Sequence, residues 1–167
     1  ILYKWVVDGE LTGDAPLVQA VQALKEVKNL DVAVNLIREF RIPREAVPTE
    51  MLTESAIWEA LLADMPLTAM TRNLGNMTKI GLLKHGWLSG DSGAVQTVIG
   101  ALKDSERLRK SRVHPVAILA ATNTYAGGKS IKGSGEWKPV KAILDALDEA
   151  FYASFGNVKT SGKKIVL

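Results

Sequence analysis

The stretch Asp64-Met-Pro-Leu-Thr-Ala-Met-Thr-Arg-Asn-Leu-Gly-Asn-Met-Thr78 indicates the fold of this 167-residue chain most directly. Its apolar side chains recur at spacings of three and four residues, which places them on one face of a helix. They are Leu67, Met70, Leu74 and Met77. Pro66 can occupy the first helical position, where its missing N–H costs nothing. The sequence therefore predicts an amphipathic helix that begins at Pro66 and ends near Gly75.

The polar face of this helix carries amide and hydroxyl groups rather than Glu and Lys. Its members are Thr68, Thr71, Arg72, Asn73 and Asn76, and Arg72 is the only charge within residues 66–78. Because buried polar groups must find hydrogen-bond partners, this face has two interpretations. It either pairs with neighbouring turns, with Arg72 bonded to carbonyl groups at a helix end, or it faces a ligand.

Similar apolar periodicity recurs along the chain, in windows 17–24, 32–40, 57–62, 94–102, 116–121 and 140–151. We expect Thr53 or Ser55 to cap the third window and Asp91 or Ser92 to cap the fourth. Gly156 suits the end of the last helix. No sustained alternation with a period of two residues accompanies these windows, so the sequence predicts an all-α array of short helices.

The prolines support this division of the chain, because proline is favoured at helix starts and excluded from helix interiors. Besides Pro66, three of them are read as helix starts and Pro43 as the start of a short turn. The three are Pro16, Pro115 and Pro139.

A glycine-rich segment, residues 126–137, cannot be helical and exposes backbone N–H groups. Trp137 ends it, and Trp87 lies in a second glycine-containing loop, residues 78–92. Each of these rings either pins its loop to the body of the protein or stacks on an unpaired base beside lysines. Trp58, in contrast, falls on an apolar helical face and is expected in the core.

The net charge of +3 is distributed unevenly. Residues 101–141 contain nine Lys or Arg residues and three Asp or Glu residues, which is an electrostatic footprint for polyanions. A solvated helical face is the alternative. The candidate phosphate ligands are Arg109, Lys110, Arg112, Lys129 and Lys132.

Several functional classes are disfavoured. The two histidines, His85 and His114, have no metal-ligand spacing, no cysteine is present, and no carboxylate constellation fits acid–base catalysis. Gly128-Lys129-Ser130 lacks the leading glycine of a phosphate-binding loop. No window is long and apolar enough to span a membrane. We therefore expect a cytoplasmic binding protein without catalytic residues, metal or cofactor.

A set of separate motifs occurs in order along the chain. It includes Arg72-Asn-Leu-Gly75 and Arg112-Val-His-Pro115, together with residues 57–62, 65–69, 118–119, 124–125, 137–139, 143–152 and 160–167. In this order they resemble the TROVE module of the Ro autoantigen family of RNA-binding proteins. The resemblance implies HEAT-like helical pairs arranged in a ring, of which this chain would form an arc. It divides the chain into a partial TROVE module, residues 1–160, and the first strand of a truncated von Willebrand factor A-like domain, residues 161–167.

The family also implies partners. Its members bind small noncoding Y RNAs and single-stranded ends of misfolded or processed RNA, and bacterial members work with exoribonucleases in RNA quality control. The other partners implied are the remaining parts of the ring and the von Willebrand factor A-like domain. Arg72, Asn73, Arg112 and His114 match family motifs and are candidate RNA contacts, although His114 also suits a helix cap. The competing hypothesis is a helical scaffold that binds a polypeptide and makes no direct RNA contact.

Overall fold

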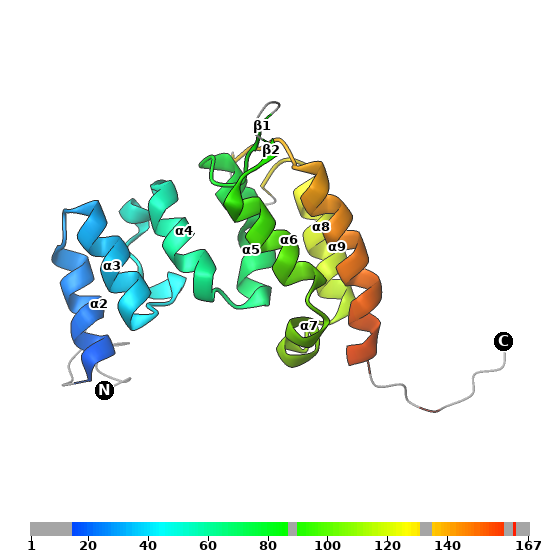
Figure 1. Ribbon diagram of the computed structural model, residues 1–167, viewed down its shortest axis with the longest axis horizontal. Coiled ribbons are helices and arrows are strands. Elements are labelled where there is room, and N and C mark those ends of the chain that lie inside the picture. Colours follow the sequence, from blue (N-terminus) through cyan, green and yellow to red (C-terminus); the bar gives the residue numbers. More distant parts are fainter. Residues whose placement is uncertain (1–14, 87–89, 131–134, 159–161, 163–167) are drawn as a thin grey trace. The chain divides into compact units, whose positions relative to one another are not determined.

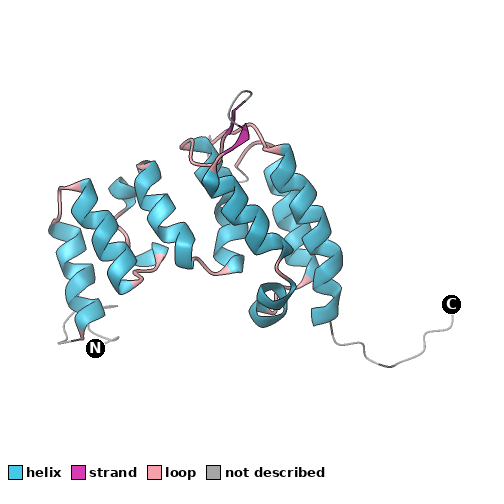
Figure 2. Cartoon of the chain, in the orientation of Figure 1, coloured by secondary structure: helices cyan, strands magenta, loops and turns pink. Residues whose placement is uncertain are grey.

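The computed structural model describes residues 15–86, 90–130, 135–158 and 162. These residues form short helices joined by short turns, as the sequence predicts (Figures 1 and 2). The α-helices are α2 (Pro16–Glu26), α3 (Leu30–Phe40), α4 (Ser55–Asp64), α5 (Leu67–Lys79), α6 (Gly93–Lys103), α7 (Ser105–Ser111), α8 (Pro115–Ala126) and α9 (Lys141–Ala153). The 3-10 helices are η1 (Arg44–Ala46), η2 (Thr49–Thr53) and η3 (Ser154–Asn157). The all-α fold class is confirmed.

A small antiparallel ladder is the only sheet in the described part of the chain. Strand β1 (His85–Gly86) pairs with β2 (Gly90–Asp91), with His85 opposite Asp91. It closes the turn between α5 and α6 (Figure 1). Two residues per strand are too few to produce the alternating pattern by which a strand is recognised in a sequence.

The chain divides into two compact units between Met65 and Pro66. In the first, α2, α3 and α4 pack around a core that includes Leu24, Ile37 and Ile57. Trp58 is 1% exposed and its indole N–H donates to the carbonyl of Leu52 at 2.8 Å. Trp58 is thus a core residue, as expected, and its single polar atom is satisfied.

In the second unit, α5 packs on α8, and α9 lies against both α6 and α8. The buried face of α5 is the one predicted from its spacing, with Met70, Leu74 and Met77 each at most 1% exposed. Ile118 of α8 and Ile143 of α9 complete this core at 0% exposure. The periodicity therefore identifies the face of α5 that packs against the rest of the unit.

Two expected caps have different outcomes. Ser92 caps α6, because its hydroxyl oxygen accepts from the N–H of Val95 at 3.4 Å. The expectation that Thr53 or Ser55 caps α4 is wrong. Glu54 occupies that position without a side-chain cap bond, and the Thr53 hydroxyl donates to the carbonyl of Glu50 inside η2. Thr53 therefore uses its hydroxyl inside η2 and does not cap α4.

Four expected boundaries also differ from the structure. The helix that was expected to end near Gly75 continues to Lys79, so this glycine is internal to α5. The last helix begins at Lys141, two residues after Pro139, and ends at Ala153, so Gly156 falls in η3. Pro66 is the N-cap of α5 and precedes its first helical residue. Of the short strand expected at residues 161–167, all residues except Gly162 lie outside the described residues.

Candidate functional site

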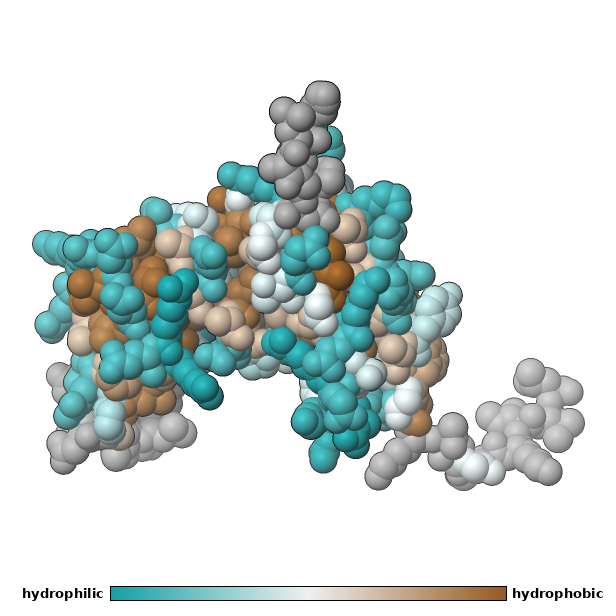
Figure 3. Space-filling model, in the orientation of Figure 1, coloured by the Kyte–Doolittle hydropathy of each residue, from teal (hydrophilic) through white to brown (hydrophobic). Residues whose placement is uncertain are grey.

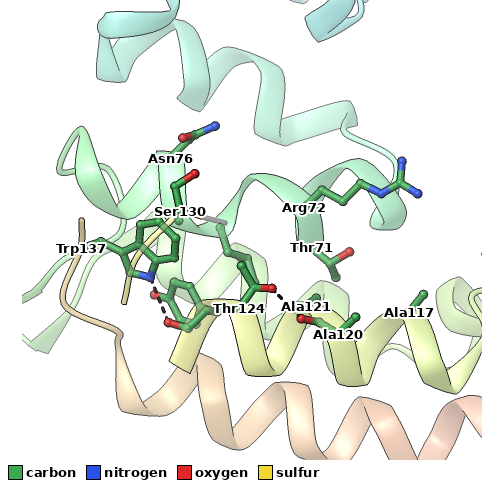
Figure 4. Close-up of a pocket in the computed structure, with 12 residues that line it drawn as sticks. Thr71, Arg72, Asn76, Ala117, Ala120, Ala121, Thr124, Ser130 and Trp137 are labelled. Carbon is green, nitrogen blue, oxygen red and sulfur yellow. Dashed lines mark hydrogen bonds between the residues drawn. The ribbon is translucent and has the colours of Figure 1, made fainter. Parts of the chain in front are cut away.

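A groove lies between α5 and α8 and is closed at one end by the segment that carries Trp137 (Figure 4). Its volume is about 790 Å³, within the range of roughly 300–1,000 Å³ that is typical of ligand sites. We call it the α5–α8 groove. Its lining residues are Thr71, Arg72, Leu74, Gly75, Asn76, Ala117, Ala120, Ala121, Thr124, Tyr125, Ser130 and Trp137.

Small residues leave space along the α8 side of the groove. Three alanines of α8 line it: Ala117, Ala120 and Ala121. Larger side chains at these positions would fill the space between the two helices. The sequence of α8 shows this composition, with apolar residues that are mostly small, although it does not show where the small face points.

Trp137 forms one wall of the groove and anchors the end of the glycine-rich segment to α5 and α8. Its ring stacks on that of Tyr125, with centroids 6.3 Å apart and planes inclined by 16°, and its indole N–H donates to the Tyr125 carbonyl at 2.9 Å. A Cβ added at Gly75 would lie 2.6–2.7 Å from the indole ring. This glycine inside α5 therefore admits Trp137, and the interpretation of Trp137 as a loop anchor is confirmed.

The hydroxyl of Tyr125 links three segments through one chain of hydrogen bonds. It accepts from the N–H of Val140 at 3.2 Å and lies 2.9 Å from the hydroxyl of Thr78, which donates to the carbonyl of Leu74 at 2.9 Å. A backbone N–H only donates and a carbonyl only accepts, so the direction of the chain is fixed. Tyr125 must donate to Thr78. This chain of hydrogen bonds connects α5 and α8 to the start of α9.

The base of the glycine-rich segment has a fixed geometry. Gly128 has φ +65°, and a Cβ there would lie 2.8 Å from the carbonyl oxygen of Trp137, so only glycine fits. The backbone N–H of Trp137 donates to the Gly128 carbonyl at 2.8 Å, and an antiparallel bridge pairs Lys129 with Glu136. Lys129 is exposed beside this bridge. Lys132, the second lysine expected to bind phosphate, lies outside the described residues.

The polar groups of the groove differ in what they can offer a ligand. Arg72 is exposed, and neither it nor the side chain of Asn76 has a hydrogen-bond or ionic partner among the described residues. In Figure 4 both side chains extend from α5. The hydroxyl of Thr71 donates to the Thr68 carbonyl at 3.2 Å, and that of Thr124 to the Ala120 carbonyl at 2.9 Å. The lining residues given above include one cation and no carboxylate.

The turn between α7 and α8 gathers a second set of predicted residues. Arg112 ends α7 in the left-handed region, with φ 51°. His114 caps α8, because its Nδ1 accepts from the N–H of Val116 at 3.2 Å. Asn157 donates to the carbonyls of Leu108 and Val113 and ties this turn to η3. His114 thus has the structural role that its position before a proline indicated.

The basic segment is less cationic in the structure than its composition implies, because the described residues include ion pairs between its basic side chains and acids. Lys103 pairs with Glu149 at 2.8 Å, Arg109 with Glu106 at 3.1 Å, and Lys141 with Asp145 at 2.8 Å. Such exposed pairs contribute little stability, but each reduces the local positive potential. Figure 3 shows a hydrophilic surface over α7. Lys110 and Arg112 remain exposed there.

No group of three or more His, Cys, Asp or Glu side chains is placed to hold a metal ion in the described part of the chain. No helix among the described residues is long and apolar enough to cross a membrane.

Comparison with known proteins identifies the family. The TROVE domain matches residues 40–125, which is more than half of the chain and includes α5, α7 and α8. The chain belongs to the TROVE domain family. Two relatives carry the name RNA-binding protein RO60. The Caenorhabditis elegans protein is 40% identical over 152 residues, and the Deinococcus radiodurans protein is 38% identical over 168 residues.

The chain covers 23% and 31% of these two relatives, so it spans less than a third of their length. A crystal structure of the Ro protein from D. radiodurans matches 93% of the chain and 31% of that protein, with a TM-score of 0.78 and 37% identity. The helical TROVE fold of this chain is therefore similar to that of a solved Ro protein.

The TROVE structure separates the predicted site residues into distinct places. Arg72 lines the α5–α8 groove, whereas Asn73 is half-buried and donates its side-chain N–H to the Ala69 carbonyl at 2.8 Å. The other described members lie at the α7–α8 turn or on the glycine-rich segment, as reported above. Thr124 also lines the groove, although it is not among the residues that the sequence predicts for the site.

Proposed function

We propose that this chain is an RNA-binding module of a Ro-type ribonucleoprotein. The observation that carries the proposal is Arg72, which lines a groove beside amide and hydroxyl groups without an acidic partner among the described residues. A guanidinium in such a place can bind phosphate through two parallel hydrogen bonds. The two relatives are named RNA-binding proteins, which supports the same function for this chain.

The RNA that we propose is Y-like noncoding RNA and the single-stranded ends of misfolded or processed RNA, bound in the course of RNA quality control. Unpaired bases can enter a groove and be read by stacking and hydrogen bonds, whereas paired bases cannot. Trp137 and the small-residue lining fit a flat base, and the amide of Asn76 can both donate and accept. An exoribonuclease and the remaining parts of the ribonucleoprotein would act as protein partners, in the cytoplasm.

We propose that Lys110 and Arg112 of the α7–α8 turn, together with Lys129 and Lys132 of the glycine-rich segment, bind RNA phosphates. Exposed lysines and arginines attract a polyanion without reading its sequence. Asn73, Arg109 and His114 would support RNA binding by holding local structure, given the hydrogen bonds and the ion pair described above.

A gel-shift titration at physiological salt tests the proposal. The purified chain should shift a single-stranded RNA, and a duplex of the same sequence should compete more weakly. Affinity should fall as salt rises, because phosphate binding releases counterions. If no RNA, single-stranded or duplex, is shifted while the chain remains folded, the proposal is wrong and a polypeptide ligand becomes the better hypothesis.

A further inference from the structure

The threonine hydroxyls of the α5–α8 groove limit the chemistry of its ligand. A hydroxyl has one hydrogen and two lone pairs. Thr124 uses its hydrogen on the Ala120 carbonyl at 2.9 Å, a bond drawn in Figure 4, and Thr71 uses its hydrogen on the Thr68 carbonyl. Toward a ligand, both oxygens can therefore only accept. A ligand that satisfies them must carry its own donors.

The cation of the groove sets a second requirement. Arg72 carries donors only and has no acidic or carbonyl partner among the described residues. It lines the groove together with Thr71 and Thr124, so a bound molecule would meet a cationic donor and hydroxyl acceptors in one cavity. An anionic group joined to a nearby hydroxyl donor complements this arrangement. A ribonucleotide has both, in its phosphate and its 2′-hydroxyl.

We infer that the α5–α8 groove binds one unpaired ribonucleotide and distinguishes RNA from DNA through the ribose. Arg72 binds a phosphate oxygen, and Oγ1 of Thr124 accepts a hydrogen bond from the 2′-hydroxyl. The base lies over the small lining residues beside Trp137. A deoxyribose has no donor to give to Thr124, and the 2′-hydroxyl is the group by which proteins separate the two polymers. This inference rests on the proposed RNA-binding function and adds the selectivity of its site.

The chain offers a matched control for Thr124. Thr122 lies on the same helix, and its hydroxyl donates in the same way to a carbonyl four residues earlier, that of Ile118, at 2.9 Å. It is absent from the lining of the groove. Replacing either threonine by valine removes one hydroxyl and one local hydrogen bond and keeps the shape of the side chain. Only Thr124→Val removes an acceptor from the groove.

The test measures binding by fluorescence anisotropy, with labelled single strands of about ten nucleotides of one sequence as RNA, DNA and 2′-O-methyl RNA. The methylated ribose can accept a hydrogen bond but cannot donate one. The wild-type chain should bind RNA about three- to tenfold more tightly than the other two strands, which is the effect of about one hydrogen bond. Thr124→Val should bring the three affinities together by weakening RNA binding alone. Thr122→Val should keep the preference for RNA.

Each other outcome overturns a specific claim. Equal wild-type affinity for RNA and 2′-O-methyl RNA overturns the role of the ribose donor and leaves RNA binding intact. The same holds if Thr124→Val and Thr122→Val change the preference equally. Absence of binding to every strand overturns this inference and the proposed function together. Helical circular dichroism of each variant checks that it is folded, and Thr124→Ser, which restores the hydroxyl, should recover the RNA preference.

Discussion

The α5–α8 groove and the α7–α8 turn both present arginine to solvent, but they do so in opposite ways. The groove has a single cation, without a carboxylate among its described lining residues, in a wall fixed by Trp137 and Tyr125. The turn has several exposed cations, and one of them, Arg109, is already paired with Glu106. Many exposed charges attract any polyanion, whereas one charge in a fixed cavity can select a particular group. The number of charges is therefore a poor guide to where recognition takes place.

The Tyr125 hydroxyl links the two helices of the groove through hydrogen bonds. Removing this hydroxyl should have the largest effect on the free energy of unfolding. Tyr125→Phe breaks the chain from Val140 to Thr78 and leaves the buried N–H of Val140 without a partner. An unsatisfied buried donor and a lost bond should together lower the free energy of unfolding by about 2–3 kcal/mol. Thermal or urea unfolding measures this change. A loss no greater than that caused by Tyr152→Phe, at an exposed tyrosine of α9, would contradict the claim.

The wall of the groove can also be tested from the side of α5. Gly75→Ala places a methyl group 2.6 Å from the Trp137 ring, and overpacking of this kind costs about 1–3 kcal/mol. Higher helix propensity returns about 0.5–1 kcal/mol, so a net loss of up to about 2.5 kcal/mol is expected. Urea denaturation measures it.

Gly100→Ala is the control for this prediction. Gly100 lies inside α6, and an added Cβ there would meet nothing within 4 Å. This variant should therefore gain about 0.5–1 kcal/mol from helix propensity alone. If both alanine variants are stabilised, Trp137 does not pack against α5 as described.

The sequence predicted the helices well because their periodicity depends on local spacing alone. The buried face of α5 and the start of α8 at Pro115 are examples, since an apolar stripe and a fixed φ both act within one helix. The prediction that the helix ends near Gly75 was wrong. Glycine is needed at this position because Trp137, 62 residues further along the chain, packs against it. Only tertiary contact explains it.

The candidate site was predictable in part for the same reason. Arg72 could be singled out because it is the only charge within residues 66–78, a property of one segment. The groove itself could not be predicted, because it needs small residues from α8 to face α5. The composition overstates the local positive charge of residues 101–141. Glu149 and Asp145 pair with two lysines of this segment but lie outside it.

The single cation of the groove should matter more for RNA binding than a paired cation of the turn. Arg72→Gln should weaken single-stranded RNA binding by about 1 kcal/mol, roughly fivefold, with little change in thermal stability. Arg109→Gln should have a smaller effect, because Glu106 already occupies that guanidinium at 3.1 Å. Paired melting curves and anisotropy titrations separate the two roles. A drop in melting temperature with unchanged binding would make Arg72 a structural residue.

The exposed cations of the turn should act through salt dependence, with a small effect at any one salt concentration. Replacing Lys110 and Arg112 by glutamine removes two positive charges that have no acidic partner among the described residues. If each neutralises one phosphate of a single strand, the slope of log Kobs against log salt should become shallower by about 0.7 per residue. The preference for RNA over DNA should not change, because phosphates are common to both polymers.

Arg112→Asn serves as a control for the turn itself, because Asn tolerates the left-handed conformation found at φ 51°. A double variant that changes the RNA preference and keeps the full salt slope would assign recognition to the turn rather than to the groove.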